Sequence, residues 1–282
     1  MEMILGIQFY GHIMNASGIG CSIDKQLQEL NESESCAIVT KSCTLEPRTG
    51  NNGRTWWKND DISINSIGIK NPGIRYYMKA LRELRPVKPQ IVSIECGLKD
   101  TFATLTYFDA HQRPQQLAEL NVSCPNTDGR MLGYNFQQLN EFLHIVDKTL
   151  TNLYGLKLPV YLDVAQFEML TKIISHHKVA FVTCCNTMRG LILDDNLKPR
   201  IDPNDGIGGI SGPTIKPFAL ANVKTFSQIF RQKNLDIKII GCGGIQSMKD
   251  VQEFLACGAA LVQMGFGLAK DDEIFKKIQS KL

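Results

Sequence analysis

The sequence predicts an α/β fold: one TIM-type (β/α)8 barrel that covers residues 1–282 as a single domain, with extended loops on its C-terminal face. Two observations carry this prediction. Eight short apolar runs recur along the chain, and stretches with a helical pattern lie between them. The length of 282 residues also suits one closed barrel better than an open doubly wound sheet.

The eight apolar runs read as buried parallel strands, because each is almost continuously apolar rather than alternating. The predicted strands are Ile13–Ser17, Ala37–Cys43, Ile91–Cys96, Ala118–Cys124, Gly155–Tyr161, Val179–Asn186, Ile237–Gly243 and Ala260–Gly265. The predicted helices include Ile23–Leu30, Asn135–Leu150, Phe167–His176, Ala219–Gln232 and Met248–Cys257. The sequence contains no internal repeat and no linker, so we expect no second domain.

Two longer segments, residues 44–78 and 191–217, interrupt the alternation of strands and helices. Both follow predicted strands, which places them on the C-terminal face, where barrel enzymes build their active sites. Long loops inside a compact domain are usually functional. The alternative, that they are ordinary surface excursions, stays open.

Composition excludes several classes of protein. The formal net charge is +3 and no run of five or more like charges occurs, which argues against a nucleic-acid tail or a polybasic membrane patch. The first residues do not resemble a signal peptide, and no apolar stretch approaches the roughly 18 residues of a membrane span. We therefore expect a cytoplasmic protein that binds neither nucleic acid nor membrane.

The nine cysteines form no CxxC pair, so neither a disulfide framework nor a metal site is expected. Most of them lie in apolar runs, where a reduced cysteine acts as a small apolar side chain. Cys124 differs, because it stands among polar residues at the end of a strand.

Polar side chains gather where the predicted strands end. The second predicted strand has Lys41 and Ser42 near its end, and the fourth contains Asn121 and ends with Cys124. Lys157 lies in the fifth predicted strand. A buried polar group without a partner costs about 1–3 kcal/mol, so several of them at one barrel mouth favour a site for a polar, planar ligand. Glycines end the seventh and eighth strands, where barrels of this type commonly bind phosphate.

These strand ends resemble the dihydroorotate dehydrogenase family, and within it the class 1A, fumarate-using branch. The resemblance covers nearly the whole chain, and the segment from Asn121 to Asn126, Asn-Val-Ser-Cys-Pro-Asn, is its most specific part. The other matching segments are Met14–Gly18, Thr40–Ser42, Ile64–Gly68, Leu156–Pro159, Gly208–Gly212, Ile215–Pro217 and Gly243-Gly244.

The resemblance implies an FMN-dependent oxidoreductase of pyrimidine biosynthesis that oxidises dihydroorotate to orotate, reduces fumarate and forms a homodimer. Cys124 would be the base that takes the C5 proton, while a hydride leaves C6 for flavin N5. Lys157 would lie near the flavin N1/O2 edge, and Lys41 between flavin and substrate.

The implied site residues form two sets. The cofactor-binding set is Ser17, Lys41, Ser42, Asn121, Lys157, Cys185, Gly212, Gly243, Gly244, Gly265 and Phe266. The substrate-binding set is Lys41, Asn65, Ser66, Ile67, Gly68, Ile69, Asn121, Asn126, Asn186 and Thr187.

The chain departs from the family pattern at three positions that bear on the site. Phe266 stands where the family usually has threonine, Glu95 where it prefers a small residue, and Asn204 where it usually has lysine. Two alternatives to dihydroorotate oxidation therefore stay open: a flavin barrel acting on another pyrimidine-like substrate, and a divergent barrel without catalysis.

Overall fold

Eight parallel strands form the centre of the molecule in the computed structural model, which describes residues 2–4, 6–85, 88–124, 131–271 and 273–279. Along the sheet their order is β3-β14-β13-β10-β9-β8-β7-β4, and every hydrogen-bonded pair is parallel. The strands are β3 (Ile13–Asn15), β4 (Ile38–Val39), β7 (Gln90–Glu95), β8 (Gln116–Asn121), β9 (Tyr154–Lys157), β10 (Val179–Cys184), β13 (Lys238–Cys242) and β14 (Leu261–Met264). The predicted TIM barrel is confirmed, although all eight strands end earlier than predicted and several polar residues follow the strands instead of closing them.

The barrel closes between β3 and β4 through a side chain rather than a full backbone ladder. Asn15 is fully buried, and its Oδ1 accepts a hydrogen bond of 2.9 Å from the Val39 amide. Its Nδ2 donates one of 2.6 Å to the Val39 carbonyl. The backbone adds one bond at this seam, from the Cys36 amide to the Ile13 carbonyl at 2.8 Å.

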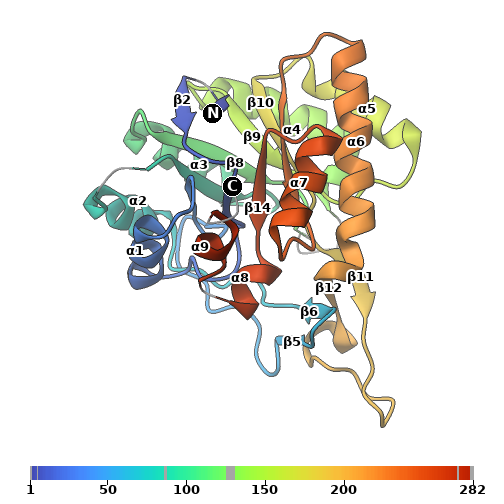
Figure 1. The fold of residues 1–282 in the computed structure, drawn as a ribbon. Coiled ribbons are helices and arrows are strands. Elements are labelled where there is room, and N and C mark those ends of the chain that lie inside the picture. The colour runs from blue at the N-terminus through green and yellow to red at the C-terminus, as the bar shows by residue number, and fades with distance from the viewer. Residues whose placement is uncertain (1, 5, 86–87, 125–130, 272, 280–282) are drawn as a thin grey trace.

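Helices surround the barrel (Figure 1). They are α1 (Asp24–Glu32), α2 (Ile74–Glu83), α3 (Thr101–His111), α4 (Phe136–Thr149), α5 (Val164–Ile174), α6 (Lys216–Gln232) and α7 (Met248–Cys257), with the short α8 (Phe266–Lys270) and α9 (Ile274–Gln279) after β14. Single turns of 3-10 helix cover Leu132–Tyr134, Pro203–Gly206 and Pro213–Ile215. All five predicted helices are present. The predicted helix at Phe167 begins earlier, at Val164, because Asp163 caps it and forms a capping box with Gln166.

The two interrupting segments are not irregular loops. They contain β5 (Trp56–Lys58), β6 (Ser63–Asn65) and β12 (Ile207–Ser211), and the second segment begins at the last residue of β11 (Met188–Leu191). These four strands form an antiparallel sheet in the order β11-β12-β6-β5. Figure 1 shows this sheet at one end of the barrel. Its position at the carboxyl ends of the barrel strands confirms the face predicted for both segments.

The opposite end of the barrel carries an antiparallel hairpin of β1 (Glu2–Ile4) and β2 (Ile7–Phe9), which the sequence analysis did not predict. Ile4, Ile7 and Phe9 are buried and belong to one apolar cluster with Met14 and other barrel residues. The hairpin therefore covers the N-terminal end of the barrel, and ligands have access from the other end.

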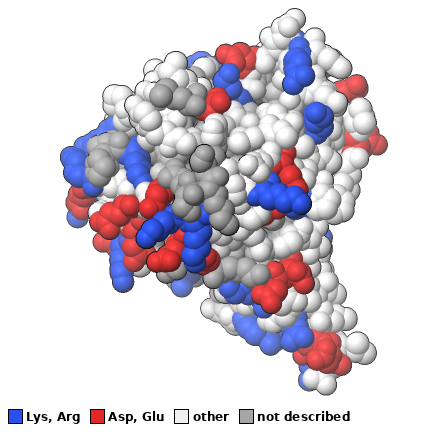
Figure 2. Space-filling model, in the orientation of Figure 1, with Lys and Arg blue, Asp and Glu red and all other residues white. Residues whose placement is uncertain are grey.

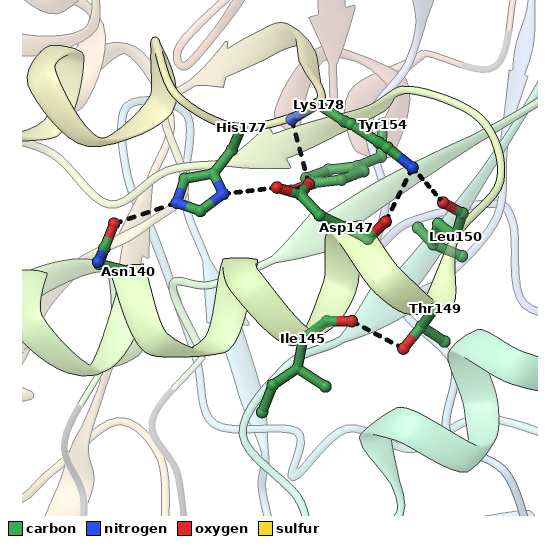
Figure 3. Close-up of polar contacts among 8 residues, drawn as sticks. All are labelled: Asn140, Ile145, Asp147, Thr149, Leu150, Tyr154, His177 and Lys178. Atoms are coloured by element: carbon green, nitrogen blue, oxygen red, sulfur yellow. Dashed lines mark hydrogen bonds and ion pairs between the residues drawn. The ribbon is translucent and has the colours of Figure 1, made fainter.

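A partly buried polar network ties α4 to the starts of β9 and β10 (Figure 3). Asp147 accepts a hydrogen bond of 2.6 Å from His177 Nδ1 and one of 2.8 Å from the Tyr154 hydroxyl. His177 Nε2 lies 3.1 Å from Asn140 Oδ1, so both ring nitrogens have partners. Burial tends to raise the pKa of Asp147, but the bonds from His177, Tyr154 and the Lys178 amide outweigh it and hold this pKa below its usual value. This network lies at the face of the barrel that usually serves stability.

The surface carries both signs of charge. In the view of Figure 2, lysine and arginine side chains alternate with aspartate and glutamate over short distances, which fits the small net charge of +3. Within the described part of the chain, no helix combines the length and apolar character that crossing a membrane requires.

Candidate active site

A cavity of about 880 Å³ lies at the carboxyl ends of the barrel strands. Its floor and walls come from residues at or just after the ends of β3, β4, β7, β8, β9, β10, β13 and β14, and β6 and β12 of the four-stranded sheet contribute the outer wall. This volume is in the range of pockets that hold cofactors and small substrates.

The cavity brings the predicted site residues together. Those of the cofactor set that line it are Ser17, Lys41, Ser42, Asn121, Lys157, Cys185, Gly212, Gly243, Gly244, Gly265 and Phe266. Those of the substrate set are Lys41, Asn65, Ser66, Ile67, Gly68, Ile69, Asn121, Asn186 and Thr187. Asn126 lies outside the described residues. The cavity shows that these residues share one site, while the role of each one stays a prediction.

Cys124 is oriented by a network of side chains after β8. Asn121 Nδ2 donates hydrogen bonds of 3.1 Å to both Cys124 Sγ and Ser42 Oγ. Asn121 Oδ1 accepts bonds from Ser123 Oγ at 2.9 Å and from Asn186 Nδ2 at 3.2 Å. Because the amide is held from both ends, it fixes the direction of the thiol that lines the cavity.

The surroundings of Cys124 keep it in the thiol form. Burial raises its pKa well above the usual value, and the carboxyl of Glu95 raises it further. Lys41 and Asn121 act in the opposite direction but do not compensate. A reaction that needs the thiolate must therefore provide a proton acceptor or bring positive charge.

Lys157 places a buried ammonium group at the cavity floor. Its Nζ donates to Gln263 Oε1 at 2.9 Å and to Cys242 Sγ at 3.2 Å. Burial alone would lower the pKa of Lys157, but Cys242 and Glu119 outweigh this effect and the pKa is raised. Lys157 is therefore a fixed positive charge.

The carboxylate that balances Lys157 is Glu119, which the sequence analysis did not place in the site. Glu119 Oε2 accepts hydrogen bonds of 2.7 Å from Gln263 Nε2 and from Thr183 Oγ1. All three residues are fully buried inside the barrel. In the sequence, each of these residues is a single polar residue within the apolar run of a different strand. Only the closed barrel shows that the three side chains lie next to one another.

Glycines at the end of the cavity nearest β13 and β14 permit close packing of the backbone. Gly212 and Gly244 have φ of 102° and 72°, and a Cβ on Gly244 would lie 2.8 Å from the Gly212 carbonyl oxygen. Phe266, the first residue of α8, is buried against the same turn, since a Cβ on Gly212 would lie 3.1 Å from its ring. Around Gly18, in contrast, a Cβ would meet no atom within 4 Å, so this backbone faces open space.

Some residues that line the cavity were missed by the sequence analysis. They include Arg48, Asn51, Trp56, Arg189 and Cys242. Arg189 lies on β11 and Trp56 on β5, and these two strands reach the cavity only because the four-stranded sheet folds over the barrel.

Comparison of the sequence with known proteins identifies the family to which the chain belongs. The sequence model of the family described as "Dihydroorotate dehydrogenase" matches residues 1–282. A Kluyveromyces lactis protein named "Dihydroorotate dehydrogenase (fumarate)" is 36% identical over 295 residues, which cover 100% of this chain and 93% of that protein. A Streptococcus agalactiae protein named "Putative dihydroorotate dehydrogenase A (fumarate)" is 37% identical over 287 residues, which cover 99% of this chain and 91% of that protein.

Proposed function

Since the chain belongs to the dihydroorotate dehydrogenase family, we propose that it oxidises dihydroorotate to orotate and uses fumarate as the electron acceptor. The observation that carries this proposal is the thiol of Cys124, which lines the cavity and is held by Asn121 at 3.1 Å. The relatives named above are dehydrogenases of the fumarate type.

We assign the removal of the C5 proton to Cys124. Dihydroorotate loses a proton from C5 and a hydride from C6, so one side chain must hold a basic atom near the substrate ring. Among the nine cysteines, Cys124, Cys185 and Cys242 line the cavity. Cys185 and Cys242 are buried close to Lys157, whereas Cys124 is bonded to Asn121, which is in turn bonded to Asn186. This difference supports Cys124 as the base, since we assign ring recognition to these asparagines.

Asparagine side chains around Cys124 suit a pyrimidinedione ring, because each presents a donor and an acceptor in one plane. Asn121 and Asn186 are bonded to each other and line the cavity on the side of β8 and β10. Asn65 lines it from β6, with its Nδ2 bonded to the Gly209 carbonyl at 3.1 Å, and an Asn65 side chain held in this way can still accept a bond at its Oδ1. Lys41 adds a positive charge for the substrate carboxylate.

The same cavity fits FMN. Lys157 supplies a fixed ammonium group for the ring edge on which negative charge develops, and the open space at Gly18 leaves room for a ligand against the backbone. At the phosphate end the donors are backbone amides after β13 and β14, because Phe266 brings no hydroxyl. When bound, FMN would accept the hydride from C6 and later return it to fumarate.

We also expect the protein to form a homodimer and to be located in the cytoplasm. Sedimentation of the purified protein would test the first expectation, and cell fractionation would test the second.

Colour provides the test of the proposed function. The purified protein should be yellow, anaerobic dihydroorotate should bleach it, and fumarate should restore the colour. A yellow protein that dihydroorotate does not bleach would show that the substrate assignment is wrong and would favour the alternative of another pyrimidine-like substrate. A colourless protein that takes up no added FMN would show a barrel without this catalysis.

A further inference from the structure

Glu95 is a buried carboxylate at the end of β7, the strand that pairs with β8, and β8 ends at Asn121, the residue that holds the proposed base. Glu95 pairs in register with Asn121 of β8 and is 2% exposed. Within the described part of the chain, neither of its carboxylate oxygens has a hydrogen-bond donor of good geometry. An ionised carboxylate left unpaired in a protein interior is costly, so a group of this kind indicates a functional site.

The neighbour that interacts with Glu95 is the thiol of Cys124. Burial is the largest influence and raises the pKa of Glu95 to about 7, even though the interaction with Cys124 acts to lower it. The charged and titratable groups that face Glu95 from the surrounding elements are Arg48, Asp100, Cys43, Cys96 and Cys124. Arg48 favours the ionised carboxylate, and Asp100 opposes it.

This arrangement is unfavourable for a cysteine that acts alone. A carboxylate beside Cys124 repels a thiolate, which is why Glu95 raises the pKa of Cys124. The same carboxylate is a good acceptor for the thiol proton. A proton can therefore leave Cys124 toward Glu95 at the moment when the sulfur takes another proton from the substrate.

We propose that Glu95 is the final acceptor of the proton that Cys124 removes from C5, so that the two side chains form a proton relay. This inference rests on the proposed function. In the relay the C5–H bond breaks and its proton joins Sγ, while the S–H bond breaks and its proton joins a Glu95 oxygen. The C5–H electron pair becomes the C5=C6 double bond as the hydride leaves C6.

The relay also accounts for the second half of the cycle. Fumarate needs a proton on one carbon when it receives a hydride on the other. Protonated Glu95 returns its proton to Sγ while Sγ gives its own to that carbon, which restores the ionised carboxylate. Since Glu95 is 2% exposed, the proton is stored away from bulk water between the two half-reactions.

Glu95→Gln distinguishes the relay from a cysteine that acts alone, because the two schemes predict opposite signs. If Cys124 acts alone, removal of the repelling carboxylate increases the thiolate fraction and speeds reduction of the cofactor by dihydroorotate. In the relay, Glu95→Gln removes the acceptor, and reduction at pH 7 slows by roughly 100-fold, the lower end of general acid–base effects. Stopped-flow bleaching of the FMN holoenzyme measures this rate.

Alkylation of Cys124 gives a second readout. Iodoacetamide should modify Cys124 faster in the Glu95→Gln holoenzyme than in the wild type at pH 8, as peptide mass spectrometry would show, because the thiolate is no longer repelled. Asp100→Asn is the matched control: it removes a neighbouring negative charge while its side-chain oxygen still accepts the 3.2 Å bond from the Leu45 amide. This control should change the bleaching rate less than threefold.

The pH profile separates the relay from a structural role of Glu95. The relay needs ionised Glu95, so the wild-type bleaching rate should fall as the pH drops through the pKa of about 7. In Glu95→Gln this fall should move to higher pH, toward ionisation of the thiol itself. Faster or unchanged bleaching of Glu95→Gln, or unchanged alkylation, overturns the relay alone. Wild-type holoenzyme that dihydroorotate does not bleach overturns the proposed function and the relay together.

Discussion

Asn121 donates a hydrogen bond of 3.1 Å from its Nδ2 to the Sγ of Cys124, and its Oδ1 accepts bonds from Ser123 and Asn186. The direction of the thiol is therefore set by a side chain that cannot rotate without the loss of several bonds. Asn121 is the last residue of β8, so the barrel itself positions the proposed base.

Replacement of Cys124 by alanine should separate catalysis from cofactor binding. The thiol is the proposed base, so Cys124→Ala should slow anaerobic bleaching by dihydroorotate at least about 100-fold. The yellow colour should remain, because the proposed cofactor-binding groups, Lys157 and the glycine turns, are unchanged. Stopped-flow absorbance measures both properties, and full bleaching speed in the variant would remove Cys124 from the mechanism.

Lys157→Met should weaken both the fold and cofactor binding. Methionine has a similar length but leaves Gln263 Oε1 and the carboxylate of Glu119 without the ammonium group. One buried acceptor without a partner costs about 1–3 kcal/mol. Urea denaturation followed by fluorescence should show this loss, and FMN titration should show weaker binding. Lys148→Met is the control. Lys148 is an exposed lysine in the last turn of α4, so its replacement should change neither measurement.

Phe266→Thr should tighten the binding of FMN at the phosphate end. The change adds a hydroxyl at the first residue of α8, and a hydrogen bond to a charged group contributes about 1.5 kcal/mol, or roughly tenfold in affinity. Riboflavin, which lacks the phosphate, should not gain. Isothermal titration of the apoprotein with both ligands measures the difference, and an equal change for FMN and riboflavin would show that Phe266 acts only through packing.

Asn15→Ala should open the seam between β3 and β4. The amide and carbonyl of Val39 would each lose a buried partner, at about 1–3 kcal/mol per group. The midpoint of urea unfolding should therefore fall markedly. Asn152→Ala removes only an exposed bond to Gln112 and should leave the midpoint nearly unchanged. Equal midpoints for the two variants would contradict the role of Asn15.

The contact between Asp147 and His177 should make stability depend on pH in the acid range. The pKa of Asp147 is below its usual value of 3.8 in the folded protein, so the folded state favours the ionised carboxylate. This contribution is complete above pH 3.8 and is lost as the pH falls through the folded pKa. Asp147→Asn should lower stability at pH 7 and flatten the acid dependence, as thermal unfolding at several pH values would show.

The barrel and most of the site could be predicted because their signals are local. Each buried strand is an apolar run in the sequence. The polar residues of the site come at the end of such a run or shortly after it, as do Lys41, Asn121, Cys124 and Asn186. The antiparallel sheet over the cavity could not be predicted in this way. Strands β5 and β6 are three residues each, and β6 pairs with β12, a partner more than 140 residues later in the chain.

The network below Lys157 was missed for a related reason. Glu119, Thr183 and Gln263 come from three different strands, and each one by itself is an isolated polar residue in an apolar run. Only the order of strands in the barrel brings them within hydrogen-bond distance. Glu95 was visible in the sequence as a departure from the family pattern, but its position beside Cys124 depends on the register between β7 and β8.

The pairing of β3 with β14 has a consequence for synthesis on the ribosome. Ile13 lies opposite Val262, so β3 cannot complete its pairing until β14, the last of the eight barrel strands, has been translated. Ser17 and Gly265, which line the same cavity, come from these two ends of the barrel. A nascent chain therefore cannot assemble the complete cavity, and its apolar strand edges stay uncovered for most of translation. We expect the cofactor to bind only after β14 has been translated, because Gly265 and Phe266 of the cavity follow that strand.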